Sequence, residues 1–175
     1  QTGRVCRMTK VRLERRELDS VPCEDDIELG PLSEEVLTDL APLAEHKDIV
    51  LNCSGGALII GSDTLLYRLV FNLVENAIRY SRPGSTVNVS ICDNDSHVFL
   101  RVEDQGPGIP KQYRESIFQP FFRLDKSRSR AYGGAGLGLA LVWEIAALHG
   151  GTVEVEASSE NGATMLTTLP KRTAA

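Results

Sequence analysis

Three polar residues stand on one face of a predicted helix that is otherwise apolar. Asn72, Asn76 and Arg79 share this face within residues 63–80, because a helix turns by about 100° per residue. Asparagine is a poor residue for the middle of a helix, so two of them one turn apart indicate a functional role. Amide oxygens suit Mg²⁺ and arginine suits phosphate oxygens. The face therefore points to metal and phosphate binding, and a merely solvated face is the alternative.

A carboxylate ends a later apolar strand. The alternation of residues 98–104 places Asp104 on the inward face of that strand, with its apolar side chains. A buried carboxylate needs hydrogen-bond donors, and the exocyclic amino group of a nucleotide base would serve. Gly106 and Gly108 follow at once and let the backbone turn close to a ligand. A structural aspartate in a tight turn is the alternative.

A glycine-rich run opens the last predicted helix. Residues 133–138 read Gly-Gly-Ala-Gly-Leu-Gly, which offers backbone N–H groups and a helix dipole to an anion such as phosphate. The run is neither a P-loop, since no Gly-Lys-Ser/Thr follows, nor the dinucleotide fingerprint, since Leu139 stands where glycine is required. Four cations precede it, at Arg123, Lys126, Arg128 and Arg130. Beside a phosphate site they could close over a triphosphate; alone they would form a solvated loop.

These residues need a scaffold of helices and strands. Periodicity predicts long helices over residues 31–47, 63–80 and 139–149 and a short one near 111–117. It predicts a hairpin from 49–53 and 57–60, strands over 87–92 and 98–103, and a closing hairpin from 152–157 and 164–169. The expected fold class is α+β, a two-layer α/β sandwich whose mixed, mostly antiparallel sheet carries three long helices on one face.

Length and charge limit the functions that remain. A chain of 175 residues is long enough for one domain. Its net charge of -5 disfavours nucleic acid and anionic membrane surfaces as partners. The longest uncharged stretches, such as residues 49–62, fall short of the roughly 20 apolar residues that cross a bilayer. The four cysteines show no CxxC spacing, so we expect reduced thiols.

The chain divides into three parts. Residues 1–26 change from basic to acidic without a hydrophobic period, which predicts a solvated linker or the tail of an upstream helix. Residues 27–171 form the expected folded domain, and residues 172–175 form a C-terminal tail. The start at Gln1 without a signal peptide leads us to expect a fragment of a longer protein.

The order of the motifs resembles one family. Residues 72–80 (Asn-Leu-Val-Glu-Asn-Ala-Ile-Arg-Tyr) look like the N box, residues 104–109 (Asp-Gln-Gly-Pro-Gly-Ile) the first glycine box, residues 118–123 (Phe-Gln-Pro-Phe-Phe-Arg) the F box and residues 134–139 (Gly-Ala-Gly-Leu-Gly-Leu) the second glycine box. The chain is similar to the catalytic, ATP-binding domain of bacterial sensor histidine kinases of two-component systems. This resemblance implies the Bergerat ATP-binding fold, which type II topoisomerases, mismatch-repair ATPases and a class of heat-shock chaperones share.

The resemblance also implies roles for individual residues. Asn72 and Asn76 would hold Mg²⁺ and act in catalysis together with Arg79, and residues 119–133 would form a mobile ATP lid. Tyr80 would pack near the adenine, and Asp104 would accept from its amino group. The nucleotide-binding residues would be Asn76, Arg79, Tyr80, Asp104, Gly106, Gly108, Ile109, Phe122, Arg123, Lys126, Arg128, Gly134, Gly136, Leu137 and Gly138.

The implied activity is transfer of the γ-phosphoryl group of Mg-ATP to a histidine. ATP-hydrolysing relatives place a glutamate base where this chain has Asn72, and asparagine cannot serve as a base. None of His46, His97 and His149 lies in a motif like the family's phosphoacceptor box. We read them as ordinary surface or helix-end histidines and place the acceptor on the protein's own dimerisation domain, outside this chain.

By the same resemblance, residues 1–26 would be a linker or the remnant of that upstream dimerisation and phosphoacceptor domain, and residues 27–171 would be the catalytic ATP-binding domain. The implied partners are the dimerisation domain and a response regulator, whose aspartate would receive the phosphoryl group in a phosphorelay. The implied location is the cytoplasmic portion of an inner-membrane sensor, without direct membrane contact by this fragment. Three alternatives stay open: a serine/threonine kinase of the anti-sigma type, a nucleotide-binding interaction module without transfer activity, and an ATP-driven clamp.

Overall fold

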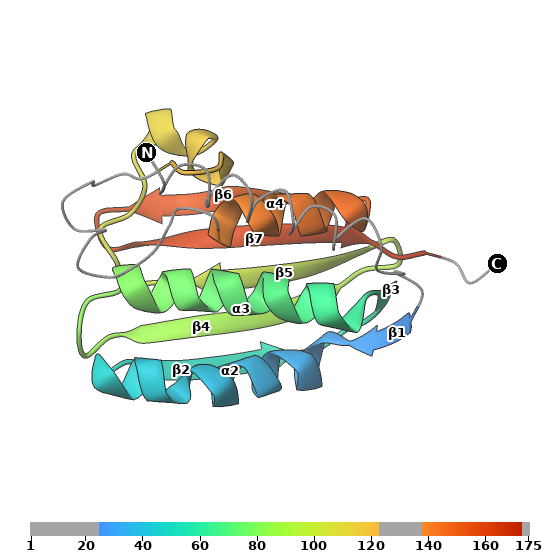
Figure 1. Cartoon of the computed structure of the whole chain (residues 1–175), viewed down its shortest axis with the longest axis horizontal. Coiled ribbons are helices and arrows are strands. Elements are labelled where there is room, and N and C mark those ends of the chain that lie inside the picture. The colour runs from blue at the N-terminus through green and yellow to red at the C-terminus, as the bar shows by residue number, and fades with distance from the viewer. Residues whose placement is uncertain (1–24, 123–137, 173–175) are drawn as a thin grey trace, which may run out of the picture.

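Three helices lie on one face of a five-stranded sheet in the computed structural model, which describes residues 25–122 and 138–172 (Figure 1). The strand order is β2 (Val50–Gly55), β4 (Thr86–Asp93), β5 (His97–Glu103), β7 (Gly162–Pro170) and β6 (Thr152–Ser159). Strand β2 pairs with β4 in parallel, and the other pairs are antiparallel. The helices are α2 (Leu29–His46), α3 (Asp63–Tyr80) and α4 (Gly138–Leu148). The predicted fold class is therefore confirmed.

Helix α3 has a clear start and a clear buried face. The Ser62 hydroxyl accepts a hydrogen bond from the Leu65 N–H at 3.3 Å and caps the first turn. The apolar face predicted for this helix is buried in the core, as shown by Leu66, Val70, Leu73, Val74, Ala77 and Ile78. Each large aliphatic side chain buried in this way contributes about 1.5–3 kcal/mol to folding. The position of the opposite, polar face is thereby fixed.

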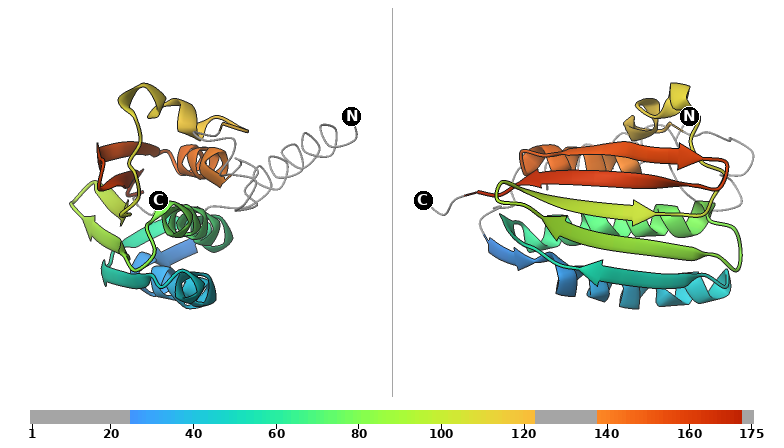
Figure 2. Two further views of the ribbon diagram at one scale, coloured as in Figure 1. Left: turned by 90° about the vertical axis from the view of Figure 1, so that its left-hand side faces the viewer. Right: turned by 180° about the vertical axis from the view of Figure 1, so that it is seen from behind.

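The core lies between the three helices and the sheet. Strands β4 and β5 alternate buried and half-buried residues along most of their length, and their inward side chains pack under the helices. The other face of the sheet carries no helix within the described residues (Figure 2). Asp104 directly follows the last residue of β5, so the same alternation that builds the core directs this carboxylate inward.

The hairpin predicted from residues 49–60 is wrong. Strand β2 pairs with β4, while β3 (Leu58–Gly61) pairs with β1 (Asp25–Glu28) in a separate two-stranded sheet. Gly55 has a φ of 79° and lies against the Ile91 carbonyl, and the link after it passes Gly30 at the start of α2. The Leu29 N–H donates to the Ala57 carbonyl at 3.0 Å, which draws this link toward α2 and away from the sheet.

Other boundaries shift only slightly. The first helix begins at Leu29, two residues before the predicted start, and the third runs from Gly138 to Leu148. The short helix expected near residues 111–117 is two 3₁₀ turns, η1 (Lys111–Tyr113) and η2 (Ser116–Phe118). Cys53 and Cys92 lie in strands and are free thiols. No helix in the described part of the chain is long and apolar enough to cross a membrane.

Candidate functional site

Asp104 is a buried carboxylate with its two oxygens in different surroundings. Only 8% of the residue is exposed. Its Oδ1 accepts from the Gly106 N–H at 3.0 Å and from the Ala163 N–H at 3.1 Å. Neither bond involves Oδ2. Burial raises the pKa of this carboxyl above its usual range, against the lowering effect of the two N–H donors. A carboxylate in this setting gains from a further donor to Oδ2.

The backbone after Asp104 passes very close to two other elements. A Cβ on Gly106 would lie 2.4 Å from the Tyr80 carbonyl oxygen, at the end of α3. Gly108 has a φ of 78°, and a Cβ there would lie 2.0 Å from the Ser159 carbonyl oxygen in β6. Only glycine fits both places. The loop can therefore follow this backbone path only with the two glycines predicted from sequence. It lies beside the buried carboxylate.

The polar face of α3 lies toward the start of α4. Asn72, Asn76 and Arg79 are all half-buried. The Asn72 Nδ2 donates to the Arg68 carbonyl at 2.8 Å, and its Oδ1 would lie 3.5 Å from a Cβ built on Gly138. Arg79 forms an ion pair with Glu75 one turn earlier. The amide oxygen of Asn72 therefore faces the first residue of α4.

Other predicted site residues lie around the same loop. Tyr80 ends α3 and is 45% exposed. Ile109 is partly buried against the core, and its N–H donates to the Ser158 hydroxyl at 2.6 Å. Phe122 packs against the core, with its ring 5.7 Å from that of Tyr113. The remaining predicted positions lie outside the described residues, namely Arg123, Lys126, Arg128, Arg130, Gly134, Gly136 and Leu137.

Three residues around Asp104 were missed by sequence reasoning. The Ala163 carbonyl accepts from the Asp104 N–H and the Ala163 N–H donates to Asp104 Oδ1, while the Ser158 hydroxyl accepts from the Ile109 N–H. The buried Ser81 accepts from the Gln105 N–H at 3.2 Å through its hydroxyl. These contacts come from backbone atoms or small hydroxyls of residues far from Asp104 in the sequence, so no local sequence pattern predicts them.

Comparison with known proteins agrees with this geometry. The family model described as histidine kinase-, DNA gyrase B-, and HSP90-like ATPase matches residues 61–173. The match includes both the polar face of α3 and the loop after Asp104. The chain belongs to this family of ATPases.

Individual relatives show which members of this ATPase family the chain resembles. The sensor-like histidine kinase SenX3 of Mycobacterium tuberculosis is 36% identical over 154 residues, which are 87% of this chain and 38% of SenX3. The sensor protein RstB of Escherichia coli is 50% identical over 99 residues, 57% of this chain and 22% of RstB. This chain therefore spans well under half of these curated relatives.

Solved structures resemble the chain in the same way. The mycobacterial sensor histidine kinase MprB has a TM-score of 0.74 at 30% identity, covering 86% of this chain and 99% of that one. The ATP-binding domain of PrrB from Mycobacterium tuberculosis has a TM-score of 0.70 at 26% identity, with 87% and 100% covered. These likenesses place the chain with the catalytic ATP-binding domains of sensor histidine kinases.

Proposed function

We propose that this domain binds Mg-ATP and transfers its γ-phosphoryl group to a histidine on a dimerisation domain of the same protein. A response-regulator aspartate then receives the phosphoryl group. The proposal rests on the relatives, which are named sensor histidine kinases, and on one structural observation, the buried Asp104. Residues 27–171 would be the catalytic unit, and the parent protein would be a membrane sensor with this domain in the cytoplasm.

Asp104 supports adenine as the base that is bound. Its Oδ1 is engaged by two backbone donors, so the carboxylate is fixed in orientation. The adenine amino group would donate to Oδ2 and supply a further hydrogen bond to the buried carboxylate. Tyr80, at the adjoining end of α3, would flank the base. ShkA, a structural relative with a TM-score of 0.74 and 28% identity, is described as a complex with AMPPNP.

The residues present fit a magnesium ion held largely by the nucleotide. Asn72 and Asn76 offer amide oxygens one helical turn apart, and the Asn72 oxygen faces the start of α4. No cluster of three His, Cys, Asp or Glu residues that could cage a metal occurs within residues 25–122 and 138–172. Mg²⁺ keeps several waters and binds few protein groups besides substrate phosphates, so two amides fit it. The bound ion would neutralise charge on the phosphates.

Asn72 supports transfer over hydrolysis. An amide cannot take a proton from water, so ATP held against this face would keep its γ-phosphoryl group until an acceptor arrives. Arg79 would meet phosphate oxygens once it exchanges its partner Glu75 for the nucleotide. The same observation disfavours an ATP-driven clamp, and the relatives disfavour an anti-sigma-type kinase.

The test uses γ-labelled ATP, this 175-residue chain and a separately prepared dimerisation domain of the parent protein. We expect label on the dimerisation domain that is lost in acid and retained in base, as phosphohistidine requires. Asp104→Asn should abolish most of the labelling at low ATP. Acid-stable label would favour the serine/threonine alternative, and no label despite measured ATP binding would overturn the transfer proposal.

A further inference from the structure

The loop that follows Asp104 is held at both ends by the tip of one hairpin. We call residues 104–109 the first glycine loop and residues 158–163 the hairpin tip between β6 and β7. At the start of the loop, the Asp104 N–H donates to the Ala163 carbonyl at 2.9 Å, and the Ala163 N–H donates back to Asp104 Oδ1 at 3.1 Å. At its end, the Ile109 N–H donates to the Ser158 hydroxyl at 2.6 Å. One short hairpin tip therefore contacts both ends of the loop.

Backbone contacts leave little free space between loop and hairpin tip. A Cβ on Gly108 would lie 2.0 Å from the Ser159 carbonyl oxygen, and one on Gly162 would lie 2.0 Å from the Asp104 carbonyl oxygen. The two segments therefore pack backbone against backbone in two places. A shift of the hairpin tip must move the loop with it.

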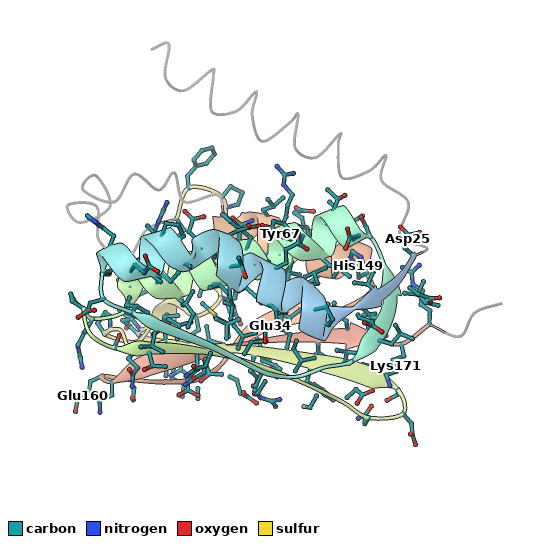
Figure 3. All side chains as sticks on the ribbon, turned by 90° about the horizontal axis from the view of Figure 1, so that it is seen from below. Asp25, Glu34, Tyr67, His149, Glu160 and Lys171 are labelled. Atoms are coloured by element: carbon teal, nitrogen blue, oxygen red, sulfur yellow. The ribbon has the colours of Figure 1, made fainter. Side chains whose placement is uncertain are left out.

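The hairpin tip is itself anchored to the end of α3. The Arg82 Nη2 donates to the Glu160 carbonyl at 2.7 Å, which joins the tip to the segment between α3 and β4. Figure 3 shows Glu160 at the end of the molecule opposite to His149 and Lys171. Gln105 in turn binds Ser81 through its N–H at 3.2 Å. The loop is thus fixed between the hairpin tip and the end of α3.

Within the hairpin tip, Ser158 is the residue that binds the loop through its own side chain. Its hydroxyl is the partner of the Ile109 N–H, whereas Ala163 and Glu160 contribute only backbone atoms to the bonds described above. Ser158 is half-buried, and the bond of its hydroxyl described above goes to the Ile109 N–H and not to Asp104. Removing its hydroxyl would leave the N–H of Ile109 without this acceptor, which is a substantial cost for a partly buried donor.

We propose that Ser158 is a positioning residue for nucleotide binding: its hydroxyl holds the end of the first glycine loop in the shape that accepts the base. The inference rests on the proposed ATP binding. Without the hydroxyl, the loop would occupy its binding-competent shape for only part of the time. The apparent dissociation constant for the nucleotide then equals the intrinsic constant divided by that fraction, so binding becomes weaker.

The experiment measures the affinity of this chain for Mg-ADP and Mg-AMPPNP by calorimetry. We expect Ser158→Ala to weaken both nucleotides by the same factor, about three- to tenfold, because the loop serves the base that both share. Ser158→Thr keeps the hydroxyl and should retain affinity. Ser158→Val has the shape of threonine but no hydroxyl, so it should lose affinity. The melting temperature of each nucleotide-free variant is measured alongside.

Ser159→Ala is the matched control. The Ser159 hydroxyl accepts from the Asn161 N–H at 3.2 Å inside the turn, so its removal perturbs the same hairpin without touching the Ile109 bond. Because Ser159 is exposed, we expect it to lower the melting temperature no more than Ser158→Ala does and to leave both affinities unchanged.

Two outcomes would overturn the inference: unchanged affinities in Ser158→Ala and Ser158→Val, or equal losses in Ser159→Ala. A wild-type chain that binds neither nucleotide would contradict the proposed function itself. The two failures are therefore distinguishable in one set of titrations.

Discussion

At the residue scale, the two carboxylate oxygens of Asp104 differ in their hydrogen bonds. Oδ1 holds the loop through the Gly106 and Ala163 N–H groups, and Oδ2, which takes part in neither bond, is the oxygen that we propose accepts from the adenine. Alternation along β5 was enough to predict that Asp104 points inward, and its burial confirms this. The split between the oxygens could not be predicted, because Ala163 arrives from a strand near the other end of the chain.

Asp104→Asn tests the ligand-facing oxygen. Asparagine can keep an acceptor oxygen toward the two backbone N–H groups, but it then presents an NH₂ group where the adenine amino group would donate. Two donors facing each other should weaken Mg-AMPPNP binding by about tenfold or more, with little change in melting temperature. Calorimetry and thermal denaturation measure the two quantities. Unchanged affinity would remove Asp104 from the nucleotide site.

Asn72 is the residue whose exchange should change the reaction. Its side chain already faces Gly138 and is held by the Arg68 carbonyl. Asn72→Glu introduces a carboxylate that can accept a proton from water, so we expect steady phosphate release from ATP where the wild type shows little. A coupled phosphate assay measures the rate. Asn72→Gln is the control, and hydrolysis by it at the same rate would exclude the base as the cause.

At the element scale, the amphipathic helices and the closing hairpin of β6 and β7 were predicted correctly, whereas the partners of β2 and β3 were not. The apolar face of α3 fixes both its buried side and the polar side with Asn72 and Asn76. Strands β2 and β3 were expected to pair, yet β2 pairs with β4 and β3 with β1. Short apolar runs do not encode their partners, and the close approach of Gly30 to the Gly55 carbonyl, which accompanies the observed pairing, joins residues far apart in the sequence.

Strand β7 contains a buried hydroxyl that lowers stability. Thr167 is fully buried, and its Oγ1 has no hydrogen-bond partner among the described residues. Thr167→Val keeps the shape and removes the unsatisfied group, so we expect it to raise the free energy of unfolding by about 1 kcal/mol. Urea denaturation measures the change. Thr168→Val, on the half-buried outer side of the same strand, should give a smaller effect; an equal gain would point to β-propensity instead.

At the scale of the whole molecule, the two ends of the sandwich differ in what holds them together. The candidate site lies at the end that carries the hairpin tip, and His149 lies at the other end (Figure 3). We had read His149 as an ordinary surface or helix-end histidine; it follows α4 directly but is only 2% exposed. Its Nε2 accepts from the Ser62 N–H at 3.1 Å, so its Nδ1 carries the proton and donates to the Ile145 carbonyl at 2.8 Å. His149 thus joins the start of α3 to the end of α4.

This histidine should make global stability sensitive to acid. Burial lowers the pKa of His149 against the raising effect of its bond to Ile145, and nearby Arg172 lowers it further. A group with a lowered native pKa contributes stability that is fully present above its unfolded pKa of about 6.5 and is lost as pH falls toward the native value. Asp104, whose pKa is raised, has the opposite pH dependence, since its contribution is present in acid and lost as pH rises. A fall in the free energy of unfolding between neutral and mildly acidic pH is therefore assigned to His149.

His149→Gln separates this effect from every other titration. Glutamine retains an acceptor for the Ser62 N–H and does not titrate, so the variant should be less stable at neutral pH but less sensitive to acid. Between about pH 7.5 and 5.5 the wild type should lose more free energy of unfolding than the variant, by at most about 1.4 kcal/mol per pH unit. Urea denaturation at both pH values gives the difference, and nucleotide affinity at neutral pH should stay the same because the site lies at the other end. Parallel losses in the two proteins would show that His149 remains neutral, or equally protonated, in both the folded and the unfolded chain.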